Sequence, residues 1–247
     1  MRLKPAVLRP PSPETLGWAG LWTALADMAI AALVMVVVVD AWAPPQDLPW
    51  KPLRLADPPG LATAAKFARA AADPTLCRAV MSEGGVDFAE EPDRADGACE
   101  TANAVRLTGG TTPLSPAAPV MSCPLALAYV FWDRHAVQPA ARAELCERVT
   151  RIEHYGVYAC RNVYGRAQGR RSEHAAANAL DVAGFRLGDG RLVTVARHFR
   201  TEDERGEFLH RARAGACRWF RATLSPDYNA AHADHLHLDY GRFRVCS

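Results

Sequence analysis

The sequence predicts an α+β protein, in which a small antiparallel sheet is flanked by helices and preceded by an N-terminal transmembrane segment. Helix-like stretches come in blocks and strand-like stretches pair locally, which is typical of α+β rather than of a parallel sheet. An apolar run near the N-terminus is long enough to cross a bilayer. With 247 residues, 49% of them hydrophobic, the chain can hold one sizeable domain with a real core.

The N-terminal segment predicts a membrane anchor and its orientation. Residues 1–15 are basic, and residues 16–39 form an apolar run of 24 residues, enough to span a bilayer despite Asp27 near its middle. Positive charges stay on the cytoplasmic side. We therefore expect an uncleaved, single-pass signal anchor in the inner membrane, with the rest of the chain in the periplasm. A cleaved signal peptide is the alternative, since Ala41-Trp42-Ala43 resembles a cleavage site. The basic residues are Arg2, Lys4 and Arg9.

The cysteines agree with that orientation. All seven lie after the apolar run, as expected for an oxidising compartment with several disulfides. No C-x-x-C pair occurs, so the sequence does not indicate a cysteine metal site or a thioredoxin motif. The odd count leaves one thiol over, and the spacing does not determine the pairing.

The rest of the chain divides into a linker and a domain. Residues 40–60 are rich in proline and predict an extended linker. Residues 61–247 form the expected domain, with a catalytic core at about 120–247. A net charge of +2 with no basic patch argues against nucleic acid as a partner.

The order of elements follows from periodicity and turn signals. Gly188-Asp189-Gly190 is a hairpin signal between two of the expected strands. We expect strands at 149–158, 179–185, 192–196 and 236–240, helices at 61–72, 123–135, 139–149 and 202–220, and loops at 82–97, 108–116 and 161–171.

Two short stretches hold side chains that bind metal. In a strand over 179–185, Leu180 and Val182 face one side and Asp181 the other. Likewise His235 and His237 share one face of the last strand. Asp181 can then meet these histidines across the sheet, and His174 can reach them from the loop before the strand. Two imidazoles and one carboxylate with an open fourth position are typical of a catalytic zinc site, where a nearby base would complete a hydrolase.

Other residues have simpler interpretations. Ser172 lacks a G-x-S-x-G context, so it is read as a turn or capping residue. A histidine outside a cluster is usually an ordinary surface or core residue, and four histidines receive this interpretation: His135, His154, His198 and His210.

These residues carry a family resemblance. The series Ser172-x-His174-x-x-Ala177-x-Ala179-x-Asp181, followed by His235-x-His237, resembles the zinc motif of the D,D-carboxypeptidase, murein endopeptidase and Hedgehog group of metallopeptidases. More closely, Tyr158-Ala-Cys-Arg161, Ser172-Glu-His-Ala and the stretch from Pro226 to Asp239 resemble the bacterial extensin-like C-terminal domain family, over roughly 76–246.

The resemblance implies His174, Asp181 and His237 as zinc ligands, an α+β fold around a small antiparallel sheet, and peptidoglycan peptides as substrates. Two departures matter. The wider group has Gly where this chain has Ala177. The carboxypeptidase branch has Glu where this chain has Asp234, one methylene shorter.

The identity of the catalytic base stays open among three residues. His235 comes first, because the endopeptidase branch also has His-x-His, and His232 and Asp234 follow. Arg161 could hold a substrate carboxylate or carbonyl, or be ordinary surface charge, and Ser172 could bond near the site. The expected function is that of a membrane-anchored zinc peptidase acting on cell-wall peptides. The alternative is a non-catalytic wall-binding module that keeps a metal site.

Overall fold

The computed structural model describes residues 13–247, so the basic residues Arg2, Lys4 and Arg9 lie outside the described part of the chain. The fold is α+β, as predicted, and most strand pairs are antiparallel. The largest sheet has seven strands: β5 (Leu114–Ser115), β7 (Val149–Gly156), β8 (Ala179–Leu187), β9 (Leu192–Thr194), β10 (Ala222–Leu224), β11 (Leu236–Asp239) and β12 (Val245–Cys246). Their order is β12-β10-β11-β8-β7-β5, and β9 pairs with β8.

Two smaller sheets lie in the first half of the domain. One has the order β1-β4-β6, and the other is a β2-β3 ribbon. Residues 82–97, where the sequence predicts a loop with at most short strands, hold the short strands β1 and β2, and the predicted loop at 108–116 contains β5 and the end of β4. The bounds are β1 (Asp87–Glu90), β2 (Arg94–Asp96), β3 (Cys99–Thr101), β4 (Ala104–Gly109) and β6 (Val120–Ser122).

The helices differ from the prediction at several ends. The helix expected at 139–149 ends at Leu145, because Cys146 adopts a left-handed conformation (φ 53°) and Val149 already opens β7. The strand expected at 192–196 stops at Thr194, where a short helix begins. The main helices are α1 (Pro13–Trp42), α2 (Thr63–Ala72), α3 (Pro74–Glu83), α4 (Cys123–Trp132), α5 (Gln138–Leu145), α6 (Val195–His198) and α7 (Glu204–Trp219). Short turns of other helix types are η1 (Pro45–Asp47), η2 (Asp133–Val137), η3 (Val163–Gly165), η4 (Glu173–Ala176) and η5 (Ala230–His232).

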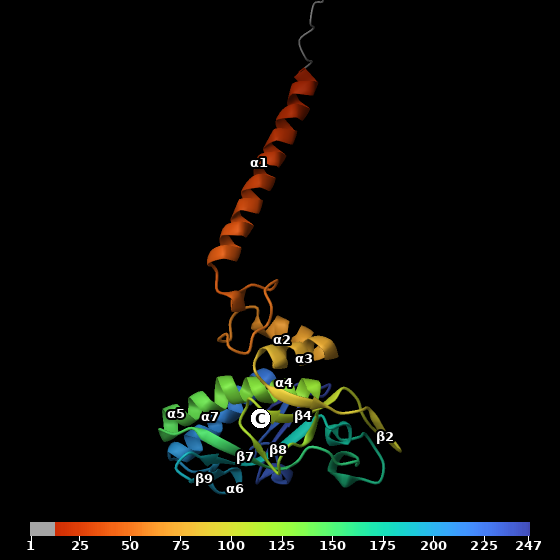
Figure 1. Cartoon of the computed structure of the whole chain (residues 1–247), viewed down its shortest axis with the longest axis vertical. Coiled ribbons are helices and arrows are strands. Elements are labelled where there is room, and N and C mark those ends of the chain that lie inside the picture. The colour runs from red at the N-terminus through yellow and green to blue at the C-terminus, as the bar shows by residue number, and fades with distance from the viewer. Residues whose placement is uncertain (1–12) are drawn as a thin grey trace, which may run out of the picture.

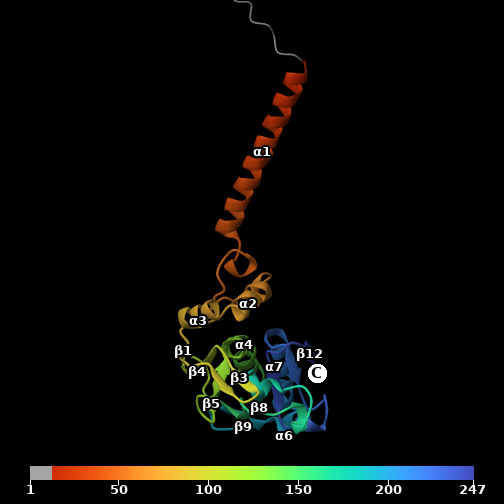
Figure 2. The same ribbon diagram turned by 90° about the vertical axis from the view of Figure 1, so that its right-hand side faces the viewer.

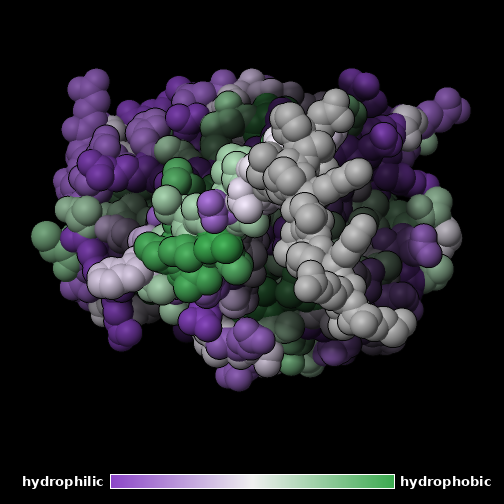
Figure 3. All heavy atoms as spheres, turned by 90° about the horizontal axis from the view of Figure 1, so that it is seen from above, coloured by the Kyte–Doolittle hydropathy of each residue, from purple (hydrophilic) through white to green (hydrophobic). Residues whose placement is uncertain are grey.

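Helix α1 projects away from the domain as a single rod (Figure 1). Its segment Gly20–Trp42 is long and apolar enough to cross a membrane, and none of it is buried in the protein. Seen from the side of α1, hydrophobic residues gather near the centre within a largely hydrophilic surround (Figure 3). By length and composition, this helix can be a membrane anchor or a signal sequence.

The proline-rich segment between α1 and α2 packs against the domain. Leu53 and Leu55 are buried in the hydrophobic core. The ammonium group of Lys66 is buried beneath the segment and donates to the carbonyl of Pro45 at 2.9 Å. These contacts connect the base of α1 to the domain.

Helix α4 is the centre of the core. Nearly all of its side chains are buried, and the indole of Trp132 donates to the carbonyl of Ala212 in α7 at 2.8 Å. Phe131 packs on Trp219 of α7 and on Phe67 of α2, with ring centroids 4.7 and 5.2 Å apart. Helices α4 and α7 lie together beside the strands (Figure 2). They take up the apolar side chains of the large sheet, leaving its other face for polar groups.

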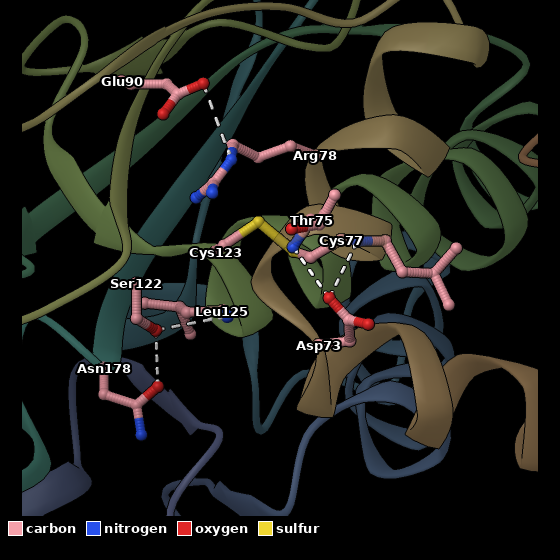
Figure 4. The surroundings of a disulfide bond; sticks show 10 residues. Asp73, Thr75, Cys77, Arg78, Glu90, Ser122, Cys123, Leu125 and Asn178 are labelled. Carbon is pink, nitrogen blue, oxygen red and sulfur yellow. Dashed lines mark hydrogen bonds and ion pairs between the residues drawn. A yellow bond between two sulfur atoms is a disulfide. The ribbon is translucent and has the colours of Figure 1, made fainter.

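Three disulfides form, Cys77–Cys123, Cys99–Cys160 and Cys217–Cys246, and Cys146 is the exposed free thiol. The first joins α3 to the start of α4 (Figure 4). Beside it, Asp73 caps α3 and Ser122 caps α4. The hydroxyl of Ser122 also bonds Asn178 at 2.6 Å, which ties this corner to the loop before β8 (Figure 4).

Replacing both Cys77 and Cys123 by serine should destabilise the domain by about 3–4 kcal/mol, because the bridge closes a long loop in the unfolded chain. Denaturant unfolding of the full-length protein in detergent measures this change. The control is Cys146→Ser, which removes an unpaired, exposed thiol and should change the free energy of unfolding by less than about 0.5 kcal/mol. Equal stability of the two variants would contradict the prediction.

Candidate metal centre

The pairing of β8 with β11 sets the geometry of the site. His237 lies directly opposite Asp181 in the antiparallel register. Their neighbours Leu180 and Leu238 also pair with each other, and both are buried in the core. Side chains alternate across a strand, so Asp181 and His237 point together to the face away from the core, as the sequence pattern predicts. Their ring and carboxylate meet with Nδ1 of His237 2.8 Å from Oδ1 of Asp181.

His174 reaches the same place from the turn before β8. Ser172 caps this turn, and its hydroxyl accepts a hydrogen bond from the amide of His174 at 3.4 Å. Ala177 ends the turn in a left-handed conformation (φ 51°). The ring of His174 is 3% exposed in the fold, and Nδ1 lies 2.9 Å from the carbonyl oxygen of Val157. Since a carbonyl only accepts, Nδ1 carries the hydrogen, and Nε2 is left facing the site.

The site has the character of a metal centre because His174 and Asp181 face each other without a hydrogen bond. Nε2 of His174 is buried and has no hydrogen-bond partner, yet it lies 3.1 Å from Oδ2 of Asp181. In the neutral ring, two lone pairs therefore oppose one another, and a cation between them removes the conflict. The donor atoms of His174, Asp181 and His237 lie within 4.8 Å of one another. Two imidazoles and a carboxylate fit a divalent ion such as zinc.

Asp239 holds the far side of His237. Its Oδ2 lies 3.1 Å from Nε2 of His237, and its Oδ1 accepts from the amide of Gly241 at 2.8 Å. Burial by itself would lower the pKa of His237, but its hydrogen bonds to Asp181 and Asp239 raise that pKa to about 9. Burial pushes the pKa of Asp181 upward, and the close approach of His174 and His237 more than reverses this, so that pKa lies well below its usual range. A carboxylate behind a metal-binding histidine is a common orienting device.

His235 and His232 complete the wall of histidines. Nδ1 of His235 lies 2.8 Å from Asp234, which leaves Nε2 directed to the cluster, 3.6 Å from Oδ1 of Asp181. The ring of Tyr155 contacts His235 from outside. His232 bonds Asn229 at 2.7 Å through Nδ1. Burial and the charges of His237 and His235 lower the pKa of His232 to about 4, so it is neutral at pH 7.

These groups lie in a cavity of about 750 Å³. Arg161 and Ser172, the candidate substrate-binding residues, line it together with His232 and His235. The side chain of Asp234 is 54% exposed and lies behind His235 rather than on the cavity wall. The histidines interpreted from the sequence as ordinary surface or core residues do not line the cavity in the described part of the chain; they are His135, His154, His198 and His210.

The sequence reasoning missed Asp239 and the carbonyl of Val157. Asp239 was detectable, because residues 235, 237 and 239 share one face of a strand. The carbonyl of Val157 carries no side-chain signal and was not detectable. Val157 follows β7 directly, and its carbonyl oxygen contacts Nδ1 of His174.

The fold and site define an α+β domain with a cluster of histidines and aspartates that can hold a divalent metal ion. A family model described as the extensin-like protein C-terminus matches residues 75–247, and the chain belongs to this family. No curated protein and no solved structure matches the chain.

The stability of the metal-stripped protein should fall as the pH rises from about 6.5 to about 9. The pKa of His237 is about 9 in the folded protein and about 6.5 in the unfolded chain. The stabilisation that protonated His237 contributes, roughly 3 kcal/mol at most, is therefore fully present below about pH 6.5. It is lost as the pH rises through the folded-state pKa of about 9. His232, with a pKa of about 4, acts oppositely and costs stability below about pH 6.5.

Denaturant unfolding after chelation, at a series of pH values, measures this profile. Asp239→Asn removes one of the two carboxylates that hold the proton on His237, so the alkaline loss should shrink. A variant with the same alkaline profile as the wild type would contradict the assignment.

Proposed function

We propose that the protein is a zinc-dependent peptidase, of the D,D-carboxypeptidase or endopeptidase type, acting on peptidoglycan peptides outside the inner membrane. One observation carries the proposal. The buried Nε2 of His174 faces the carboxylate of Asp181 without a hydrogen bond, beside His237, on the wall of a cavity of about 750 Å³. The resemblance of this motif to that of the zinc metallopeptidases supports the reaction class.

His174, Asp181 and His237 would hold the zinc. When bound, zinc supplies Lewis acidity, which acidifies a water molecule and polarises a peptide carbonyl. The protein prepares each ligand separately. The carbonyl of Val157 fixes the tautomer of His174, and Asp239 orients His237 from behind. The core packing of β8 and β11 fixes Asp181.

His235 is the best-placed base. Asp234 accepts the hydrogen of Nδ1, so the lone pair of Nε2 is directed to the cluster, where it can take a proton from the nucleophile and return it to the leaving amine. Asp234 then orients the base, a role that differs from that of the Glu in the carboxypeptidase branch. His232 is neutral at pH 7 and lines the same wall, so it can donate to or accept from the reacting groups as a second choice.

The proposed location rests on α1 and the disulfides. The segment Gly20–Trp42 can cross a membrane, and three disulfides suit an oxidising compartment. We infer an inner-membrane anchor with the domain in the periplasm. This location would place the cavity within reach of the cell wall.

A second candidate is a non-catalytic module that binds the wall and keeps the metal for stability. The observation that favours it is the exposed position of Asp234, which bonds His235 and leaves the cavity wall without the Glu of the related carboxypeptidases. Retained binding to purified peptidoglycan without cleavage by the metal-loaded wild type would establish this candidate.

The purified full-length protein should contain about one zinc per chain. The His237→Ala variant should lose the zinc, because only two of the three proposed ligands, His174 and Asp181, remain. His210→Ala is the matched control, since His210 of α7 packs on Phe199 away from the cavity lining and its replacement should leave the metal content unchanged. Elemental analysis after dialysis measures the ratio. A wild type without metal would overturn the proposal at its first step.

Removing the base should separate metal binding from turnover. His235→Ala should keep the zinc but lower kcat/KM on peptidoglycan peptides by about 10²- to 10⁴-fold. Asp234→Asn should cause a smaller loss, because it perturbs only the orientation of the ring. Chromatography of digested peptides, with and without chelator, measures cleavage. Unchanged turnover in His235→Ala would move the role of base to His232.

A further inference from the structure

The wall of the cavity beyond the metal centre is made by the C-terminal segment, residues 240–245. Arg242, Phe243 and Arg244 from this segment all line the cavity. A second segment, residues 161–171, faces it and contributes Tyr164 and Arg170. The cavity lining therefore combines histidines and carboxylates with arginines and aromatic rings.

The two arginines of the C-terminal segment have no internal counter-charge. Within residues 13–247, neither Arg242 nor Arg244 belongs to any ion pair or side-chain hydrogen bond. Several other arginines of the domain are paired, for example Arg186 with Glu153 at 3.3 Å. The carboxylates on the same cavity wall are already engaged by histidines, by an amide or by a side-chain amide. Two positive charges are thus left for an external anion.

The C-terminal segment is fixed at both ends. At one end, the amide of Gly241 bonds Asp239, the residue that orients His237. At the other, the amide of Val245 donates to the carbonyl oxygen of Arg221 at 2.9 Å, and Cys246 forms a disulfide with Cys217. Arg242 and Arg244 therefore sit on a short, tethered stretch whose starting point is the metal centre. A tethered site loses less entropy on binding than a free tail would.

Aromatic rings gather around the same opening. The exposed ring of Phe243 lies under the guanidinium of Arg170, 5.0 Å from its centroid. Tyr164 and Tyr228 also line the cavity while remaining partly exposed. Among residues 61–247, the exposed aromatic side chains are these three and two neighbours that follow one another closely at the end of β7, Tyr155 and Tyr158. Three of these five exposed rings line one cavity, and exposed rings that gather in this way indicate a ligand-binding surface.

We propose that Arg242 and Arg244 form an anion subsite that binds a free carboxylate of the peptide, next to the metal centre. Arginine binds carboxylates in a bidentate geometry, and the surrounding rings cover the apolar parts of the ligand. The inference rests on the proposed function for the identity of the ligand as a cell-wall peptide. It adds a specificity: acidic stem peptides with free carboxylates bind, and their amidated forms bind weakly.

The test compares two fluorescent peptidoglycan stem peptides that differ only in having free carboxylates or carboxamides. Anisotropy titration measures their affinities for the full-length, zinc-loaded protein in detergent. The wild type should bind the free acid about 10- to 100-fold more tightly, the range expected for a charge-assisted pair. Arg242→Gln with Arg244→Gln should abolish most of this preference while keeping the zinc content and the thermal midpoint. The preference should also weaken at high salt.

Arg151→Gln is the matched control, because Arg151 is an exposed arginine of β7 that does not line the cavity. It should keep the wild-type preference. Equal binding of both peptides by the wild type, no binding of either, or an unchanged preference in the double variant would each overturn the subsite. If the double variant fails to fold, the two single variants replace it. Because binding is measured apart from cleavage, a wild type that binds the free acid selectively but cleaves nothing refutes the peptidase and leaves the subsite standing.

Discussion

The register between β8 and β11 is the constraint on which the site depends. A slip of either strand by one residue would turn its own leucine, Leu180 or Leu238, to the polar face and bury its own polar residue, Asp181 or His237. Fully burying each leucine contributes roughly 1.5–3 kcal/mol, and burying an unpaired carboxylate would cost several more. The hydrophobic core therefore selects the pairing of the two polar residues. Their own attraction need not hold the strands together.

The turn that carries His174 has a different source of order. Ala177 is buried and left-handed at φ 51°, a conformation that costs a non-glycine residue about 1–2 kcal/mol. Gly adopts this left-handed conformation without the steric cost of a Cβ atom, so the backbone at this position suits Gly. In this chain the turn is held from outside, since the carbonyl of Ala177 accepts from the amide of Ser122 at 2.8 Å. The buried methyl group offsets part of the strain by packing in the core.

Features that depend on neighbouring residues could be predicted from the sequence, and features that depend on distant contacts could not. Period-two alternation around Asp181 and His237 correctly placed both residues on the polar face, because alternation is local. The end of α5 was wrong, because the left-handed residue there is Cys146 and not the Gly that usually marks a helix end. The packing of Leu53 and Leu55 in the core was missed, because prolines around them indicate an extended chain and not its contacts. The same alternation places Asp239 on the face of His237, but nothing in the sequence around Asp239 indicates that its carboxylate contacts the His237 ring.

The three disulfides lie next to segments that surround the site and not within its central strands, β8 and β11. Cys160 immediately precedes the loop at 161–171, and its bridge to Cys99 anchors that loop to the β2-β3 ribbon. Cys246 ends the segment that carries Arg242 and Arg244. Cys123 adjoins Ser122, whose amide and hydroxyl hold the turn of His174. Each bridge thus lies next to a segment that shapes the site. The core positions Asp181 and His237, and the covalent links keep the surrounding residues close enough to act on one ligand.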